Sequence, residues 1–268
     1  MFDADLSFPE GARIALLSDV HLQAQDAATH ALWVSTLQSL QADALFILGD
    51  LFEVWVGDDA LLATGTEGLN FEAQCAAALS HLSQRMPVYF MAGNRDFLAG
   101  PGLMAASGMT ALPDPCSISL GGQRLLLSHG DALCLADTAY QAFRQQVRGA
   151  AWQRSFLARP LAERQALAKA MREQSAKRQQ DPGVRELGDA DDELALRWLR
   201  QADASVLIHG HTHRPADHAL DAGHWRVVLS DWDAQAQPPR AELLWLHRDG
   251  WLRQDLAPQQ PARSTHRT

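Results

Sequence analysis

The sequence predicts an α/β fold, and two observations support this prediction. From residue 13 to about residue 112, short apolar runs alternate with segments of helical character, which is typical of strands joined by helices. The apolar runs are also largely bounded by turn residues, as expected for strands buried in a sheet. The 268 residues, 47% of them apolar, allow one large domain or two small ones.

The first half of the chain supplies most of the alternation. We predict strands at 14–17, 44–48 and 88–91, and helices at 31–41 and 71–84. Further strands at 116–120 and 124–128 flank Gly121-Gly122, which is a signal for a two-residue hairpin. Antiparallel pairing is therefore expected at this point.

The second half contains an insertion of different character. Residues 138–201 have few glycines, and their apolar residues recur at helical intervals among many Arg, Gln and Ala. We expect two to four helices, broken near Pro160 and near 181–183, that form an inserted helical cap. Strands resume at 205–208, 225–229 and 241–246. The predicted core is 1–137 with 202–256, and 257–268 is expected to be a disordered tail.

Charge and composition restrict the possible partners. The net charge of −9 argues against general nucleic-acid binding. Residues 138–187 nevertheless carry ten basic and four acidic residues, so a basic segment lies inside an acidic protein. The sequence shows neither a secretory signal pattern nor an apolar run of about 18 residues, which favours a cytoplasmic protein with at most peripheral membrane contact. Cys75, Cys116 and Cys134 suit a reduced core because they are odd in number and lack metal-like spacing.

Five short polar motifs follow the predicted strands. They are Asp19-Val20-His21, Gly49-Asp50, Gly93-Asn94-Arg95-Asp96, His129-Gly130-Asp131 and His209-Gly210-His211-Thr212-His213. The carboxyl ends of strands form the edge where ligands bind in open α/β sheets. Residues two apart in a strand face the same side, so each Asp-x-His or His-x-His pair can point two donors into one crevice. A single such pair is more often a capped loop, but five motifs in order favour a metal centre.

The donor types indicate two metal ions. Two metals close together need a bridging carboxylate, and Asp50, preceded by Gly49, is the natural bridge. Asn94 offers a neutral oxygen, whereas His129, His211 and His213 offer nitrogens. Mixed oxygen and imidazole donors suit manganese, iron or zinc better than calcium, and we expect Mn²⁺. We expect His209 to be structural, and Asp58, Asp59, Asp96 and Asp131 to cap loops or orient ligands as readily as they touch substrate.

In this order, the motifs resemble those of the calcineurin-type metallophosphoesterases, over residues 13–246. The resemblance implies two packed mixed β-sheets flanked by helices and a centre with two metal ions. It implies that the first metal is held by Asp19, His21, Asp50 and His213. It implies that the second is held by Asp50, Asn94, His129 and His211.

Arg95 departs from the pattern of that superfamily, which commonly has a histidine near the leaving group. A permanent cation can hold a phosphate but cannot donate a proton at neutral pH. Cleavage of a pyrophosphate expels a phosphate monoester, which leaves without protonation. The substitution therefore favours a pyrophosphate substrate.

Residues 48–59, 93–98, 129–134 with 140–143, and 208–215 closely resemble the UDP-2,3-diacylglucosamine hydrolase family of lipid A synthesis. The resemblance implies cleavage of a UDP-linked diacylated glucosamine lipid to UMP and 2,3-diacylglucosamine 1-phosphate, on the cytoplasmic face of the inner membrane. It implies catalytic roles for Asp50, Asn94, Arg95 and His129. It also implies substrate contacts by Asn94, Arg95, Asp137, Ser175, Gln179 and His211, although the family typically has Asn in place of Gln179.

Two alternatives to this interpretation remain. The chain could hydrolyse a soluble dinucleotide or phosphodiester, but the basic, apolar-studded cap favours a lipid because a soluble nucleotide needs no acyl groove. It could also be a scaffold without catalysis, which the complete set of donors argues against. Besides the lipid and an anionic membrane surface, we expect no protein or nucleic-acid partner.

Overall fold

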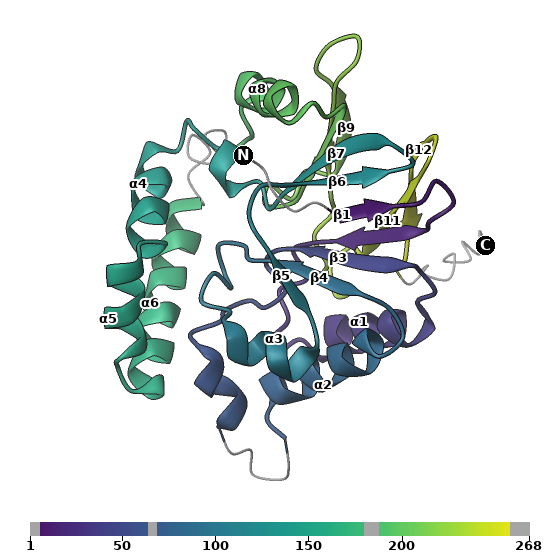
Figure 1. Ribbon diagram of the computed structural model, residues 1–268. Coiled ribbons are helices and arrows are strands. Elements are labelled where there is room, and N and C mark those ends of the chain that lie inside the picture. Colours follow the sequence, from purple (N-terminus) through teal and green to yellow (C-terminus); the bar gives the residue numbers. More distant parts are fainter. Residues whose placement is uncertain (1–5, 64–68, 180–187, 258–268) are drawn as a thin grey trace, which may run out of the picture.

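Two six-stranded mixed sheets pack face to face at the centre of the molecule (Figure 1). The computed structural model describes residues 6–63, 69–179 and 188–257, with the backbone alone for 174–179. The first sheet has the order β12-β11-β2-β3-β4-β5, with bounds Gly250–Asp255, Glu242–His247, Ile14–Leu17, Ala44–Leu48, Val88–Met91 and Thr110–Leu112. The second has the order β1-β6-β7-β8-β10-β9, with bounds Leu6–Phe8, Cys116–Leu120, Gln123–Ser128, Val206–His209, Trp225–Val228 and Ala216–Ala219.

Both sheets mix parallel and antiparallel pairs. Strands β2 to β5 are parallel neighbours, and the β11–β12 hairpin adds to β2 in antiparallel fashion. In the second sheet β7, β8 and β10 are parallel, whereas β6 pairs antiparallel with β7 through the predicted Gly121-Gly122 turn. Both turn glycines have positive φ, 57° and 86°, which suits a tight hairpin. The expected α/β fold of two packed mixed sheets is confirmed.

Alternation along the strands sorts side chains into layers. In β2, Ile14 and Leu16 point into the cluster between the sheets, whereas Ala15 and Leu17 point into the cluster under the helices. This follows from the two-residue period of a strand. Both faces of the strand are buried, which explains why the run is continuously apolar.

Helices cover the outer face of each sheet. Helices α1 (Ala27–Ser39), α2 (Phe71–Ser83) and α3 (Pro101–Ser107) lie under the first sheet (Figure 1). Helix α1 begins four residues before the predicted start because the Asp26 side chain caps it, accepting from the backbone N–H of Thr29. Helix α8 (Asp192–Ala202) packs on β7 and β8 through Ala195 and Leu199. We therefore propose to count α8 with the core rather than with the cap.

The cap comprises α4 (Thr138–Val147), α5 (Ala150–Leu157) and α6 (Leu161–Gln179), which stand beside the sheets in Figure 1. The predicted break near Pro160 separates α5 from α6. Trp152 and Phe156 of α5 stack on each other and pack against the main core cluster. Arg164 of α6 is buried and donates to the carbonyl of Val56 and to Asp59. Polar and apolar contacts thus both fix the cap.

Several elements were missed by the sequence prediction. Strands β1, β5, β9 and β12 lie at sheet edges, and none of them contains a buried residue. The break predicted at 181–183 and most of the predicted tail lie outside the described residues. In the described part of the chain, no helix combines the length and apolarity that crossing a membrane requires. All three cysteines are unpaired and buried, as expected.

Candidate metal centre

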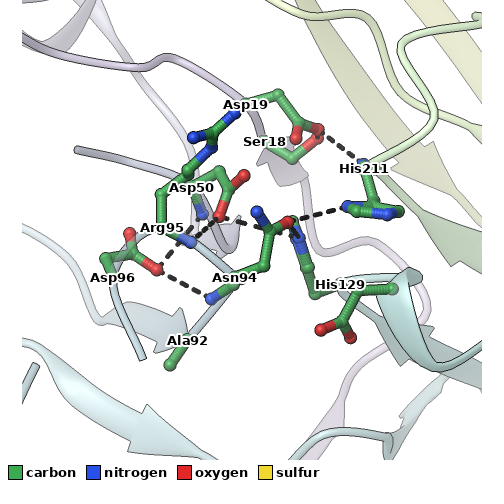
Figure 2. A network of polar contacts seen from close by, with 12 residues as sticks. Ser18, Asp19, Asp50, Ala92, Asn94, Arg95, Asp96, His129 and His211 are labelled. Atoms are coloured by element: carbon green, nitrogen blue, oxygen red, sulfur yellow. Dashed lines mark hydrogen bonds and ion pairs between the residues drawn. The ribbon is translucent and has the colours of Figure 1, made fainter. Parts of the chain in front are cut away.

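The polar motifs meet at the carboxyl ends of strands from both sheets. Asp50 and Asn94 follow β3 and β4 of the first sheet. His129 and His211 follow β7 and β8 of the second. Figure 2 shows these four side chains converging on one another. Asp19, which follows β2, lies on the same edge.

The donor residues lie in loops with left-handed backbone, which corrects the expectation that each pair alternates along a strand. Asp19, His21, Asp50, His211 and His213 have φ angles of 52°, 53°, 52°, 68° and 52°. Residues with a β-carbon rarely adopt this region. The loops stay in register because the N–H of His21 donates to the carbonyl of Asp50 at 3.0 Å. Turn geometry, rather than strand period, orients the paired donors.

Two glycines let the loops approach one another. A β-carbon on Gly93 would lie 2.2 Å from Asp50 Oδ1, and one on Gly210 would lie 2.1 Å from Asp19 Oδ2. Both distances are far inside van der Waals contact, so only glycine fits without rearrangement. The glycines of the Gly-Asn and Gly-His motifs therefore provide space for the donor carboxylates.

Asp19, His21 and His213 form the first donor group. The Nε2 atoms of the two histidines are 3.2 Å apart, and Asp19 Oδ1 lies 3.3 Å from His213 Nε2. Asp19 is fully buried, yet its Oδ1 has no hydrogen-bond partner among the described residues. Buried polar atoms are normally satisfied, so an unsatisfied carboxylate oxygen beside two imidazole nitrogens fits a cation.

Asp50, Asn94, His129 and His211 form the second donor group. Asn94 Oδ1 lies 3.0 Å from His129 Nε2 and 2.8 Å from His211 Nδ1. His129 Nε2 is 3.7 Å from Asp50 Oδ1. The other oxygen of Asp50, Oδ2, lies 4.0 Å from His21 Nε2 in the first group. The two oxygens of Asp50 thus face the two groups, which is the position of a bridging carboxylate.

Contacts behind the histidines select the nitrogen that faces the site. The Nδ1–H of His129 donates to the carbonyl of Leu48 at 2.9 Å, and His21 Nδ1 lies 2.8 Å from Glu53 Oε2. His213 Nδ1 lies 3.8 Å from Asp231 Oδ2. Such outer contacts fix the tautomer and ring orientation of metal-binding histidines. In all three residues they leave Nε2 for the site.

Burial and neighbouring charges set the pKa values of these groups. Burial lowers the pKa of His129, but Asp50, Asp131 and Asp19 outweigh burial and raise it to about 9. Burial, aided by the charge of His129, lowers the pKa of His211 to about 3. Burial also opposes ionisation of Asp19, but contact with His213 outweighs it and holds the pKa of Asp19 well below its usual range. Carboxylates that favour a proton on His129 equally favour a metal cation.

The donor set as a whole fits divalent metal ions. One donor atom each from Asp19, His21 and His213 lie within 4.8 Å of one another, and so do atoms of Asp19, Asp50 and His129. Asp19 and Asp50 carry negative charge into a buried region in which a cation would offset it. The chemistry of the set is oxygen and imidazole, with thiolates absent from these two groups.

The comparisons with known proteins agree with this arrangement. Residues 12–215 match the model of the calcineurin-like phosphoesterase family. A UDP-2,3-diacylglucosamine hydrolase from Chromobacterium violaceum is 44% identical, covering 82% of this chain and 90% of that protein. Proteins of the same name from Bordetella pertussis and Aeromonas hydrophila are 40% and 44% identical, covering 88% and 82% of this chain and 92% and 90% of theirs. The chain belongs to the UDP-2,3-diacylglucosamine hydrolase family of calcineurin-like phosphoesterases.

In this member of the hydrolase family, Asp131 joins the second donor group to the cap. The buried Asp131 Oδ2 accepts from Tyr140 Oη at 2.7 Å, Arg144 Nε at 2.8 Å and Arg148 Nη2 at 3.3 Å, all on or directly after α4. Burial raises the pKa of Asp131, but His129 and these arginines outweigh burial and hold it well below its usual range. The Tyr140 ring also stacks on His211, 5.8 Å between centroids. Asp131 therefore anchors α4 beside the second donor group.

Asp96 and His209 have supporting positions. Asp96 is buried and accepts from the backbone N–H groups of Gly93 at 2.7 Å and Leu51 at 2.8 Å, so it holds the loops on both sides of Asp50. His209 is also buried, with Nδ1 2.8 Å from the carbonyl of Gly210, and belongs to neither donor group. Burial lowers the pKa of His209 to about 4, so it stays neutral. The expectation of a structural His209 is confirmed.

Asp58 and Asp59 lie on η1 (Asp58–Leu62) and support its surroundings. Asp58 accepts from the indole N–H of Trp55 at 3.1 Å and from the N–H of Gly100 at 3.0 Å. Asp59 pairs with Arg164 of the cap. Both carboxylates thus have structural partners in the hydrolase.

Arg95 lies at the centre of the site. Its backbone N–H donates to Asp50 Oδ1 at 2.8 Å, which fixes the start of its side chain beside the Asp50 carboxylate (Figure 2). Its Nε is buried and has no hydrogen-bond partner in the described part of the chain. A guanidinium with an unused donor in a phosphoesterase site is suited to a phosphate oxygen.

The cap residues expected to touch substrate are placed only in part. Asp137 is half-buried and caps α4 by accepting from the N–H of Tyr140 at 3.0 Å. Ser175 and Gln179 fall on α6, where the side chains are outside the described residues. Glu53, which the sequence analysis missed, bridges His21 and Arg172 of α6. Its position three residues after Asp50 was the available signal.

Proposed function

We propose that this protein hydrolyses the pyrophosphate bond of UDP-2,3-diacylglucosamine and releases UMP and 2,3-diacylglucosamine 1-phosphate, a step of lipid A biosynthesis. The observation that carries the proposal is the 40–44% identity to proteins of that name over 82–90% of the chain. The donor groups around Asp50 supply the matching chemistry.

We propose that Asp19, His21, Asp50 and His213 hold one metal ion and that Asp50, Asn94, His129 and His211 hold the other. The chemistry supplied by two bound divalent ions is Lewis-acid catalysis, namely a lower pKa for the attacking water and stabilisation of charge on phosphate oxygens. Manganese is our first choice because imidazole and carboxylate donors occur together. Asn94 also offers its amide N–H₂ to a phosphate oxygen.

Arg95 has the role of a phosphate clamp. Its planar guanidinium can donate two parallel hydrogen bonds to the pyrophosphate and remains charged throughout the reaction. It cannot protonate the leaving group, but the lipid phosphate leaves without a proton. We propose that the water attacks the phosphorus that carries uridine, so that the lipid phosphate is the leaving group.

The cap is the element that we expect to select the lipid. Four of its basic residues form ion pairs with carboxylates of the core: Arg144, Arg148, Arg164 and Arg172. Arg154 and Lys169 are exposed on α5 and α6. We infer that these exposed cations favour an anionic lipid surface and that Asp137, Ser175 and Gln179 contact the substrate. Peripheral attachment to the cytoplasmic face of the inner membrane follows from this proposal.

Product analysis tests the function directly. The purified protein with Mn²⁺ should convert UDP-2,3-diacylglucosamine to UMP and the lipid phosphate, with much lower rates on a dinucleotide and on a simple phosphodiester. In ¹⁸O-labelled water, the label should enter UMP. Label found only in the lipid phosphate would place the attack on the other phosphorus, and preference for the dinucleotide would favour a soluble nucleotide as substrate.

A further inference from the structure

Arg148 lies directly after α4 and reaches from the cap into the core. Its Nη2 atom lies 3.1 Å from the carbonyl oxygen of Gly93 and 3.4 Å from that of Ala92. The same nitrogen lies 3.3 Å from Asp131 Oδ2. Because Nη2 carries two hydrogens, it can donate to the loop after β4 and to the segment after β7 at the same time. One guanidinium thus joins two separate parts of the core.

Both of these segments carry a residue of the second donor group. The carbonyl of Gly93 belongs to the peptide group that precedes Asn94, and Asp131 lies two residues after His129. The two donor side chains face each other, with Asn94 Oδ1 3.0 Å from His129 Nε2. Arg148 therefore connects the backbone behind one donor to the segment behind the other.

The backbone just before Asn94 is held from two sides. The N–H of Gly93 donates to Asp96 Oδ1 at 2.7 Å, and the carbonyl of Gly93 accepts from Arg148. Asp96 is a buried residue of the core, whereas the side chain of Arg148 comes from the cap and is 24% exposed. Glycine is conformationally permissive, so the orientation of this peptide group depends on such contacts. Loss of the Arg148 contact would let the peptide group rotate and would move the oxygen of Asn94.

Charge alone would give Arg148 the opposite effect. A guanidinium near a metal position repels the cation, so its removal would strengthen metal binding if charge were the only factor. Arg144 offers a comparison, because its Nε lies 2.8 Å from the same Asp131 Oδ2. In the described part of the chain, the ion pairs of Arg144 go to Asp131 and Asp114, and not to the loop of Asn94. The two arginines thus carry the same charge to one carboxylate but differ in the contact with that loop.

We propose that Arg148 is a positioning residue, which holds the loop of Asn94 against the segment of His129 and thereby sets the distance between these two donors. The inference deepens the proposed function and rests on it, because the second donor group is one of the two proposed metal positions. It also gives the cap a part in metal binding. The second group keeps its geometry only while the end of α4 is seated on the core.

Calorimetric titration of Mn²⁺ into the metal-free protein tests the effect on the second donor group, which corresponds to the binding step that His129→Ala removes. Arg148→Gln should weaken this step about tenfold, as is typical of contacts behind metal ligands, and leave the other step unchanged. Excess Mn²⁺ should restore kcat, with the KM for the lipid substrate unchanged throughout. An unchanged or tighter step in Arg148→Gln would overturn the inference. A raised KM that excess Mn²⁺ does not correct would also overturn it, because Arg148 would then contact the substrate.

Hydrogen exchange of the metal-free protein tests the contact itself, without metal or substrate. Exchange at the amides of residues 92–96 should accelerate in Arg148→Gln and stay at the wild-type rate in Arg144→Gln, the matched control. Arg148→Lys keeps the charge but ends in a compact ammonium, so it should give an intermediate rate and serves if Arg148→Gln does not fold. Wild-type exchange in either variant of Arg148 would overturn the inference. If exchange responds as described but the wild type leaves the lipid substrate intact, the proposed function fails and the contact between cap and loop remains.

Discussion

The two donor groups differ in their enclosure and support. In the second group, His129 is fully buried and Asp50 is 2% exposed, and Asp131 ties this group to α4. In the first group, the side chains of His21 and His213 are 16% and 40% exposed. The difference teaches that the second donor group lies at the junction of core and cap, whereas the first opens toward solvent. We expect the first ion to exchange faster.

The largest effect should come from the residue that both groups share. Asp50→Ala removes the bridging carboxylate, so kcat/KM should fall at least about a thousandfold and bound metal should drop below one ion per chain. His213→Ala should lose the exposed ion and keep the buried one. Elemental analysis after desalting measures both. Equal metal content in Asp50→Ala and the wild type would refute the shared ligand.

Arg95→His should have the next largest effect. The substitution introduces a group that can donate a proton but removes the guanidinium fork, so kcat/KM on the lipid substrate should fall about a hundredfold. Arg154→His, on the exposed side of the cap, is the control and should change little. Steady-state kinetics over a range of substrate concentrations decides. Wild-type turnover in Arg95→His would remove this residue from the mechanism.

Substitution of the carboxylates Asp131 and Asp231 should then affect the two donor groups differently. Asp131→Asn weakens the contacts of α4 behind His129, and we expect about 10- to 100-fold weaker binding of the buried ion. Asp231→Asn should weaken binding of the more exposed ion by a smaller factor, because Asp231 lies 3.8 Å from His213. Calorimetric titration of metal into the metal-free proteins resolves the two steps. If both variants weakened the same step, the two supports would not be separate.

The smallest effect should come from the second attachment of the cap. Arg172→Gln breaks the pair with Glu53, which is partly exposed, so the stability change should be within about 1 kcal/mol. Hydrogen exchange in α6 should nevertheless accelerate, while α4 keeps its protection. Arg154→Gln is the matched control on α5. Accelerated exchange in α4 as well would mean that the cap responds as one unit.

Sequence patterns predicted much of the core because its chemistry is local. Strands β2, β3 and β8 are buried on both faces, so their sequences are continuously apolar. Such a run can be recognised in the sequence without knowing which strands lie next to it. Edge strands such as β9 are half-exposed and carry no comparable signal. The fold of the cap helices also followed from helical spacing, but their attachment did not.

The donor residues of the site were predicted from the sequence, but the contacts that hold them in place were not. Asp19, Asp50 and His129 were found because donors at strand ends are a recognisable pattern. The roles of Glu53 and Arg148 depend on contacts across 119 and 55 residues of sequence, to Arg172 and Gly93. Such pairs appear only when the chain is folded. The left-handed turns were hidden for the same reason, since Asp and His give no strong signal for them.

Those left-handed turns limit how stable this protein can become while it remains active. Each residue with a β-carbon in that conformation costs roughly 1–2 kcal/mol, and five of the donors adopt it. The sum rivals the stability of about 5–15 kcal/mol of a whole domain. Asp203, with φ of 51° at the end of α8, has the same conformation away from the site, so Asp203→Gly should raise the melting temperature without loss of activity. Selection for heat resistance alone would therefore first favour replacement of these donor residues, and the more stable protein would have lost its activity.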